Sequence, residues 1–455
     1  MVEKDMQVIA IGNGRFVRRK EFVKEYGLQR ALVYFILFFT LIMETIIAVV
    51  PSLSIIRYVN DLALVVLFLA SGVKFLGAFK NIGCKPVLTA TALFVFSCLV
   101  STVINLVPIN LVLWGTRNTY RGILYLFFAV TYLDGEDLKT IFKALFYVQI
   151  VNFVLALYQY FALGYKQDML GGIFGYGNSS GVTTFNLLLL AYYFNAYVAK
   201  KERGLKVLFV TLTALVISAL AEEKMIFVFY LVVVVTTVLI NKPSVRKFTV
   251  TVVSLACLAG GFALFYVVFP RAAETFFGFG SLIDYSKKIG GGYNIPRLGA
   301  FSFISENIFN GDPLKILFGC GIGNCDTSSY SIFQSAFFNE YGHYNYRWFV
   351  HQWVFLEGGL FGFLSYLSIF VTALVCVVGR RKKCDKEMKH FNVAGIISGL
   401  YCIAVIWYNA TLKFDMCYVA FFALATGLIS LKKSVTVKKT DNGNRFIERK
   451  NKSDG

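Results

Sequence analysis

The sequence is dominated by apolar runs of about twenty residues, the length that an α-helix needs to cross a hydrocarbon layer of about 30 Å. A soluble domain carries charge at about a quarter of its positions, whereas this chain carries it at 16% and is 57% hydrophobic. We therefore predict an all-α polytopic membrane protein. About twelve runs qualify as transmembrane helices, at 31–50, 58–79, 86–107, 111–133, 138–163, 181–199, 205–221, 224–240, 248–269, 353–378, 391–410 and 416–431.

The excess of cations, 45 Lys and Arg against 26 Asp and Glu, follows the connections between these runs. No basic domain or aromatic-interleaved basic patch accompanies the net charge of +19, so nucleic-acid binding is not predicted. Connections rich in Lys and Arg face the cytoplasm in membrane proteins. Most of the cations fall on one side when the runs are threaded alternately. Both tails, 1–30 and the basic 432–455, are therefore predicted to be cytoplasmic.

On the other side, the threading leaves one long connection, 270–352, between transmembrane blocks at 31–269 and 353–431. Structureless connections longer than about 15 residues are uncommon unless they are functional. Within this loop we predict a helix at 298–308 and a glycine-rich turn at 319–323. Cys320 and Cys325 are close enough in sequence to form a small disulfide ring in an oxidising compartment, or to remain two free thiols.

Four short segments, together with the membrane layout, carry a resemblance to a known family. They are PRLGAF (296–301), DPLKILFGCGIG (312–323), HQWVFLEGGLFG (351–362) and SALAEEK (218–224). They resemble the O-antigen ligase and O-antigen polymerase family, GT-C-like membrane glycosyltransferases that move a glycan from an undecaprenyl diphosphate carrier to an acceptor hydroxyl. The resemblance implies a bacterial inner-membrane enzyme that inverts the anomeric centre and uses no metal and no cofactor. It also implies as partners the lipid-linked donor glycan, the acceptor glycan, the lipid bilayer, a chain-length regulator and a flippase.

The chemistry of such a transfer points to particular side chains. A diphosphate leaving group departs as an anion and needs fixed cations, and the arginine fork binds it through two parallel hydrogen bonds. Arg297 is the first candidate, and Lys224, where the family has an arginine, is a second charge. The acceptor hydroxyl needs a base with a pKa near the working pH, which favours histidine. We predict His351 as the base. His343 is the second choice, because His351 precedes the Glu-x-Gly segment by fewer residues than is usual in the family.

Two further arginines lie inside a predicted transmembrane helix. Arg117 and Arg121 are four residues apart and so share one face of the run 111–133. Cations at this depth usually face a cavity or a partner. They either bind the phosphates of the donor or pair with a carboxylate such as Glu44.

Each of these residues has an alternative structural interpretation. Arg297 is alternatively one half of a surface ion pair. His351 is alternatively a helix cap or a residue of an interfacial aromatic belt, and Lys224 is alternatively a cation that reaches the interface and pairs with Glu222 or Glu223. The loop aromatics Tyr341, Tyr344, Tyr346 and Trp348 are either packing residues or platforms for sugar rings.

The leading interpretation is a polysaccharide polymerase that joins lipid-linked repeat units. An O-antigen ligase or a protein O-oligosaccharyltransferase of the same family would use the same machinery on another acceptor. A transporter or flippase is the alternative from another class, and it predicts broken helices and ionisable residues in several spans. The spans read as mostly uninterrupted, which favours the enzyme. A membrane scaffold without chemistry is a third interpretation.

Overall fold

The computed structural model describes residues 6–11, 15–277, 294–432 and 434–437, and within these ranges the chain is almost entirely helical. The glycine-rich stretch at 290–293 and most of the predicted cytoplasmic tail at 432–455 lie outside the described residues. Within the described ranges, seven stretches are long and apolar enough to cross a membrane, and three shorter apolar helices accompany them. The protein is therefore a multi-pass, all-helical membrane protein in its membrane-spanning part.

The helices occur at every predicted span. In the first half of the chain they are α1 (Arg19–Glu25), α2 (Gly27–Val49), the 3-10 helix η2 (Pro51–Tyr58), α3 (Val59–Ser71), α4 (Phe75–Asn81), α5 (Lys85–Ile104), α6 (Ile109–Tyr132), α7 (Gly135–Phe161), α8 (Ser179–Val198) and α9 (Gly204–Leu220). In the second half they are α10 (Lys224–Ile240), α11 (Val245–Val268), α12 (Pro270–Phe277), α14 (Ala300–Asn307), α15 (Pro313–Phe318), α16 (Ala336–Tyr341), α17 (Val350–Gly379), α18 (Lys389–Tyr408) and α19 (Cys417–Ile429).

Length and apolarity alone identify ten of the twelve predicted spans as apolar helices of the structure. The long apolar stretches are α2, the stretch Pro51–Asn81 with α3 and α4, α5, α7, α11, α17 and the stretch Lys386–Tyr408 with α18; the shorter ones are α9, α10 and α19. The remaining two predicted spans, 111–133 and 181–199, correspond to α6 and α8, which are less apolar. Both are extensively buried, so their polar side chains face protein.

Two predicted spans are interrupted, and each of the others corresponds to one helix, so the expectation of mostly uninterrupted spans holds with two exceptions. The span predicted at 58–79 divides into α3 and α4 at Gly72, which has a positive φ of 53°. Helix α17 begins at Val350, three residues before the predicted start, and breaks at Gly359, where φ is 63°. A Cβ at Gly359 would overlap the backbone of Leu317 and Phe318. Only glycine suits this position, because it tolerates the positive φ and lets α15 approach closely.

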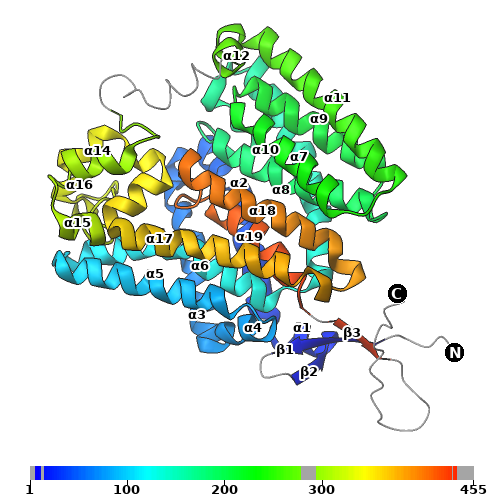
Figure 1. Ribbon diagram of the computed structural model, residues 1–455, viewed down its shortest axis with the longest axis horizontal. Coiled ribbons are helices and arrows are strands. Elements are labelled where there is room, and N and C mark those ends of the chain that lie inside the picture. Colours follow the sequence, from blue (N-terminus) through cyan, green and yellow to red (C-terminus); the bar gives the residue numbers. More distant parts are fainter. Residues whose placement is uncertain (1–5, 12–14, 278–293, 433, 438–455) are drawn as a thin grey trace.

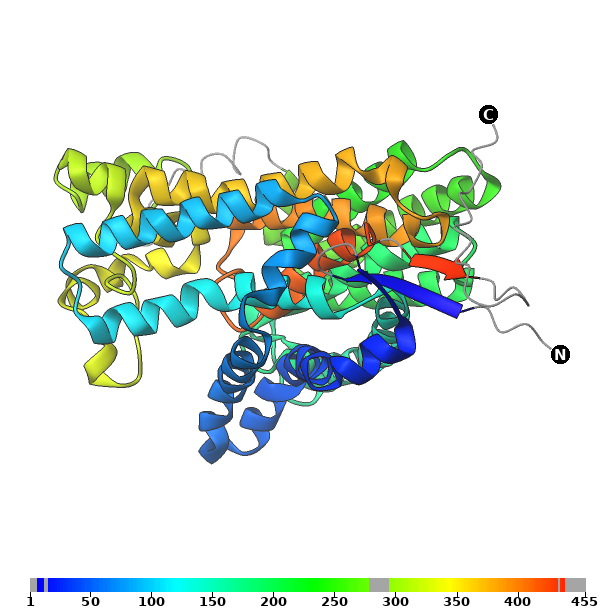
Figure 2. The same cartoon turned by 90° about the horizontal axis from the view of Figure 1, so that it is seen from below.

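The arrangement of the helices separates two ends of the molecule. Helices α5 and α17 run side by side and α6 packs against α19, while α14, α15 and α16 gather at one end of α5 and α17 and the three strands lie toward the other end (Figures 1 and 2). The outer loop was predicted to lie on the side of the membrane opposite the tails, and that stays a prediction. Which end faces the cytoplasm stays a prediction.

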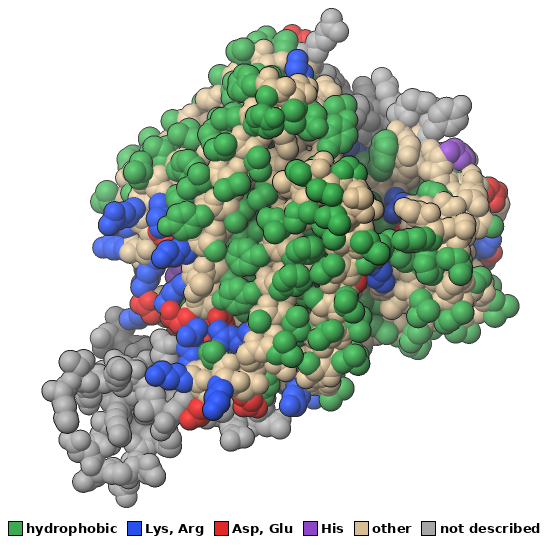
Figure 3. Space-filling view, turned by 180° about the vertical axis from the view of Figure 1, so that it is seen from behind, with side chains coloured by type: hydrophobic (Ala, Val, Ile, Leu, Met, Phe, Trp, Pro, Cys, Tyr) green, Lys and Arg blue, Asp and Glu red, His purple; other side chains and the backbone are tan. Residues whose placement is uncertain are grey.

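Ion pairs hold the end that was predicted to be cytoplasmic. Asp134 and Asp137 form a capping box at the start of α7, so that each side chain accepts a hydrogen bond from the backbone of the other. The same carboxylates bind cations from the N-terminal segment: Arg19 lies 2.8 Å from Asp134, and Arg30 pairs with Asp137. Cations and carboxylates gather along the lower edge of the face that Figure 3 shows, while hydrophobic side chains cover the broad area above them.

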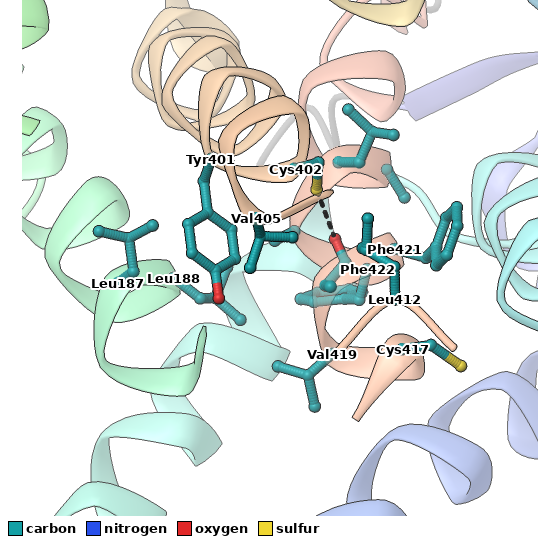
Figure 4. Close-up of a cluster of buried hydrophobic side chains, with 14 of the residues drawn as sticks. Leu187, Leu188, Tyr401, Cys402, Val405, Leu412, Cys417, Val419, Phe421 and Phe422 are labelled. Atoms are coloured by element: carbon teal, nitrogen blue, oxygen red, sulfur yellow. Dashed lines mark hydrogen bonds between the residues drawn. The ribbon is translucent and has the colours of Figure 1, made fainter. Parts of the chain in front are cut away.

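The core between α8, α18 and α19 is apolar and closely packed. Leu187 and Leu188 of α8 lie toward Tyr401 and Val405 of α18, and Phe421 and Phe422 of α19 complete the cluster (Figure 4). The Cys402 thiol donates to the Ala420 carbonyl at 3.8 Å. Helices α18 and α19 approach through Gly395 and Gly427, whose backbones are in contact. Small residues at such crossings are typical of membrane helix packing.

A small antiparallel sheet joins the two ends of the described chain. Strand β1 (Met6–Ile11) pairs with β2 (Arg15–Arg18) on one side and with β3 (Ser434–Val437) on the other. The order β2-β1-β3 places the first and last described segments next to each other.

Candidate functional site

A polar pocket of about 340 Å³ lies at the end of the bundle that was predicted to face outward. It is built where several elements end: η2, the first half of α6, the loop at 327–329, the start of α17 and the connection between α18 and α19. The lining side chains are Arg57, Tyr58, Trp114, Arg117, Asn118, Arg121, Thr327, Ser328, Ser329, Arg347, Trp353, Lys413, Phe414 and Asp415. Five of these residues are cationic, and one is a carboxylate.

Each cation of the pocket is paired with its own carboxylate. The pairs are Arg57–Glu44 (2.9 Å), Arg117–Asp61 (2.5 Å), Arg121–Asp415 (2.5 Å), Arg347–Asp326 (3.5 Å) and Lys413–Glu357 (2.6 Å). Apart from Asp415, these carboxylates do not line the pocket. The cations therefore face the interior, and most of the carboxylates stand behind them and hold them in place.

A hydrogen-bonded chain connects two of these pairs. Arg117 donates to the side-chain oxygen of Asn118 at 2.7 Å, and the Asn118 amide donates in turn to Asp326, the partner of Arg347. The guanidinium of Arg117 also lies over the rings of Tyr58 and Trp114, at 5.0 and 4.8 Å from their centroids. Contacts of this kind restrict the arginine, so its orientation is largely set before a ligand binds.

Glu357 ties the glycine-rich turn to α17 and to the pocket. Its carboxylate accepts hydrogen bonds from the Gly323 backbone N–H at 2.9 Å and from Lys413 at 2.6 Å. Its backbone carbonyl accepts from Gly321 at 2.9 Å and from the Ser101 hydroxyl at 2.7 Å. Lys413 lies 4.1 Å from the centroid of Trp353. One carboxylate thus positions both a loop and a pocket cation.

Arg297 and His351 lie together, away from the lining of this pocket. The Nδ1 atom of His351 lies 3.2 Å from the Ile406 carbonyl oxygen, and the backbone and charge of Arg297 interact with the ring. The Arg297 guanidinium lies over Phe349 at 4.7 Å and over Tyr408 at 5.8 Å. The His351 side chain is buried, with 1% of the residue exposed.

Lys224 lies near this second group. The Tyr408 hydroxyl, beneath Arg297, donates to Glu223 at 3.5 Å, and Lys224 follows Glu223 in the chain. Lys224 itself forms an ion pair with Glu222 at 3.0 Å. This is the pairing that the alternative, purely structural interpretation of Lys224 predicted.

The candidate residues from the sequence thus occupy three places. Arg117 and Arg121 line the pocket. Arg297 lies beside His351 and over Tyr408, which contacts Glu223, the residue before Lys224. His343 is exposed, with its ring 4.1 Å from that of Tyr344. Arg117 and Arg121 combine both predicted alternatives, because they face a cavity and pair with carboxylates. Their partners are Asp61 and Asp415, and the suggested partner Glu44 pairs with Arg57 instead.

The structure of the outer loop decides two alternatives from the sequence, the state of Cys320 and Cys325 and the role of Tyr346. Cys320 and Cys325 are free thiols, and burial raises the pKa of Cys320 to about 12. Tyr346, one of the four aromatic candidates for sugar stacking, is fully buried and donates to the Cys325 carbonyl at 2.9 Å. It is therefore a packing residue. The predicted helix at 298–308 is present as α14.

Sequence reasoning missed four charged residues of the pocket: Arg57, Arg347, Lys413 and Asp415. All four lie in connections predicted to be external, where cations are few. For the three cations that scarcity was the available signal, because the preference of cations for the cytoplasmic side does not explain a cation on the outer side. Asp415 offered no such signal.

No group of three or more His, Cys, Asp or Glu side chains within the described ranges is arranged as metal ligands would be. A scan of the sequence against models of protein families finds no match, and a search of curated proteins finds none either.

Proposed function

We propose that the chain is a bacterial membrane glycosyltransferase that moves a glycan from an undecaprenyl-diphosphate-linked donor to a hydroxyl of an acceptor glycan, as a polysaccharide polymerase does. The proposal rests on the segments that resemble the O-antigen ligase and polymerase family. Its main structural support is the pocket, in which Arg57, Arg117, Arg121, Arg347 and Lys413 converge.

This pocket suits a diphosphate for three reasons. Its volume falls within the range of about 300–1,000 Å³ that is typical of small-molecule sites. Guanidinium groups bind phosphate oxygens through paired hydrogen bonds. The carboxylates behind the cations fix them before the ligand arrives, and preorganised charges stabilise a developing anion best because they need no rearrangement during the reaction.

His351 stays our prediction for the base, with Arg297 as a cation beside it. His351 and the pocket residue Trp353 belong to the same turn of α17, but residues two apart leave a helix about 200° from each other. The body of α17 therefore separates His351 from the pocket in this conformation. Transfer by this route requires the first turn of α17 or residues 294–299 to move when the acceptor binds.

The experiment compares two arginines in matched surroundings. Arg117 lies over Tyr58 at 5.0 Å in the pocket, and Arg246 lies over Tyr197 at 5.1 Å at the opposite end of the molecule. Purified protein in lipid nanodiscs is given a synthetic undecaprenyl-diphosphate-linked repeat unit, and released lipid diphosphate and polymer are measured. We expect Arg117→Lys to lower transfer at least about tenfold, because lysine keeps the charge and loses the paired hydrogen bonds, while Arg246→Lys stays near the unaltered protein. Absence of glycan transfer by the unaltered protein would contradict the proposed function.

Transfer to a lipid A core or to a protein would use the same donor site, and a comparison of acceptors in this assay distinguishes the three enzymes.

A transporter or flippase is the second candidate, and the break in α17 at Gly359 beside the buried Lys413–Glu357 pair favours it more than the sequence did. Movement of the labelled lipid across a vesicle membrane without a covalent product would support transport.

A further inference from the structure

Asp415 is the one acidic side chain among the described residues that line the pocket. The other carboxylates of the five ion pairs stand behind their cations, whereas Asp415 shares the interior with them. Its side chain is 30% exposed. Its carboxylate accepts a hydrogen bond from Arg121 at Oδ1, at 2.5 Å, and it interacts electrostatically with Arg57.

An ionised carboxylate accepts hydrogen bonds and cannot donate them. A bare diphosphate is likewise an anion with acceptor oxygens at neutral pH. Placed in this pocket, a bare diphosphate would be attracted by the five cations and repelled by Asp415. The carboxylate therefore disfavours a ligand made of phosphate alone.

A ligand that also carries hydroxyl groups fits the whole lining. A hydroxyl can donate to Asp415, while the phosphate oxygens accept from the arginines. Among the neutral acceptors of the lining, the side-chain oxygen of Asn118 already accepts from Arg117, and that of Ser328 accepts from the Tyr330 backbone N–H. The hydroxyls of Tyr58, Thr327 and Ser329 also line the pocket, but a neutral hydroxyl accepts a weaker hydrogen bond than a carboxylate does. Asp415 is thus the acceptor best placed for a hydroxyl next to the phosphate-binding cations.

We propose that Asp415 accepts a hydrogen bond from a hydroxyl of the first sugar of the donor, so that the pocket distinguishes a glycosyl diphosphate lipid from a prenyl diphosphate without sugar. This role rests on the proposed function, since it assumes that the donor occupies the pocket. It also gives the pocket a way to release its product. Once the sugar has been transferred, the hydroxyl is lost and the carboxylate faces the remaining diphosphate.

The test measures binding of two probes: undecaprenyl diphosphate, and undecaprenyl diphosphate carrying the first sugar of the repeat unit. The unaltered protein should bind the sugar-bearing lipid about tenfold more tightly, as one charge-assisted hydrogen bond allows. Asp415→Asn removes the negative charge at nearly constant shape. It should bind the bare lipid more tightly than the unaltered protein does and lose most of the preference for the sugar.

The matched control is Asp61→Asn, which also removes the carboxylate partner of a pocket arginine but lies behind that arginine. It should change the affinity for both probes by the same factor and keep the preference for the sugar-bearing lipid. Asp415→Glu, which keeps the charge one methylene farther out, should reduce the preference without tightening binding of the bare lipid.

The outcomes separate the two proposals. If the unaltered protein binds neither lipid, the proposed function fails and this role fails with it. Equal binding of both probes by the unaltered protein overturns the role of Asp415 alone. The same holds if Asp415→Asn weakens both probes to the same extent, because a merely structural carboxylate would act that way. Tighter binding of the bare lipid by Asp415→Asn supports the role and shows that the variant is folded.

Discussion

Lys413 and Glu357 form an ion pair of 2.6 Å that is almost wholly excluded from solvent, with 1% and 5% of their side chains exposed. The pair joins the connection between α18 and α19 to α17, two residues before its break at Gly359. Because both charges are buried, each depends on the other for compensation.

We expect Glu357→Gln to destabilise the protein by about 3–5 kcal/mol, since it leaves the Lys413 ammonium buried without a counter-charge. Thermal unfolding in detergent, followed by circular dichroism, measures the change. The pair Arg57–Glu44 serves as the control, because its side chains are 47% and 23% exposed. Glu44→Gln should cost at most about 1 kcal/mol. Equal losses in the two variants would show that burial does not set the contribution of these pairs.

His351→Asn separates a catalytic from a structural role of the histidine. The Asn amide can still donate to the Ile406 carbonyl, as Nδ1 of the ring is placed to do, but it supplies no base in place of Nε2. If His351 is the base, the variant should bind the lipid-linked donor as before and lose transfer, while His343→Ala stays active. Transfer that persists in His351→Asn would make the Ile406 contact the whole role of this residue.

The pH dependence of stability should show the titration of Lys432. Its ammonium donates to the carbonyl oxygens of Thr131 (2.9 Å) and Leu133 (2.7 Å), and burial lowers its pKa from 10.5 to about 8. Between about pH 8 and 10.5 the unfolded chain therefore binds more protons than the folded protein at this residue, so its contribution to stability rises with pH in that window. We expect the unfolding midpoint of Lys432→Met to rise less between pH 8 and 10 than that of the unaltered protein. Parallel profiles would contradict the assignment.

The orientation in the membrane can be measured by cysteine labelling of intact cells. In a variant without native cysteines, a membrane-impermeant maleimide should label Asn339→Cys, which is exposed in the outer loop. Lys386→Cys, exposed in the connection between α17 and α18, should react only after the cells are opened. The reverse pattern would invert the predicted topology.

Apolar length and cation placement were sufficient to locate a helix at every predicted span, because the bilayer imposes both on the sequence. They did not reveal the breaks at Gly72 and Gly359. A glycine in an apolar run looks the same whether it continues a helix or interrupts it. At Gly359 the deciding factor is the close approach of the Leu317–Phe318 backbone, from a distant part of the chain.

The sequence predicted only part of the candidate site, because some of its residues come together only through contacts between distant parts of the chain. Arg117 and Arg121 could be found from sequence because charge inside an apolar helix is costly and needs a partner. Lys413 and Asp415 lie in a five-residue connection between two predicted spans, where charge is ordinary. Their importance arises only when folding brings α6, α17 and that connection together around one pocket.

The pairing of β1 with β3 constrains how the chain is threaded and how it is made. Two strands that share hydrogen bonds must lie in the same aqueous compartment, so the polypeptide between them crosses the bilayer an even number of times. Twelve crossings satisfy this parity, and eleven or thirteen do not. The pairing also orders biogenesis, because Met6–Ile11 leaves the ribosome before all the helices and Ser434–Val437 leaves after them. This sheet therefore closes only after every helix between them has been synthesised.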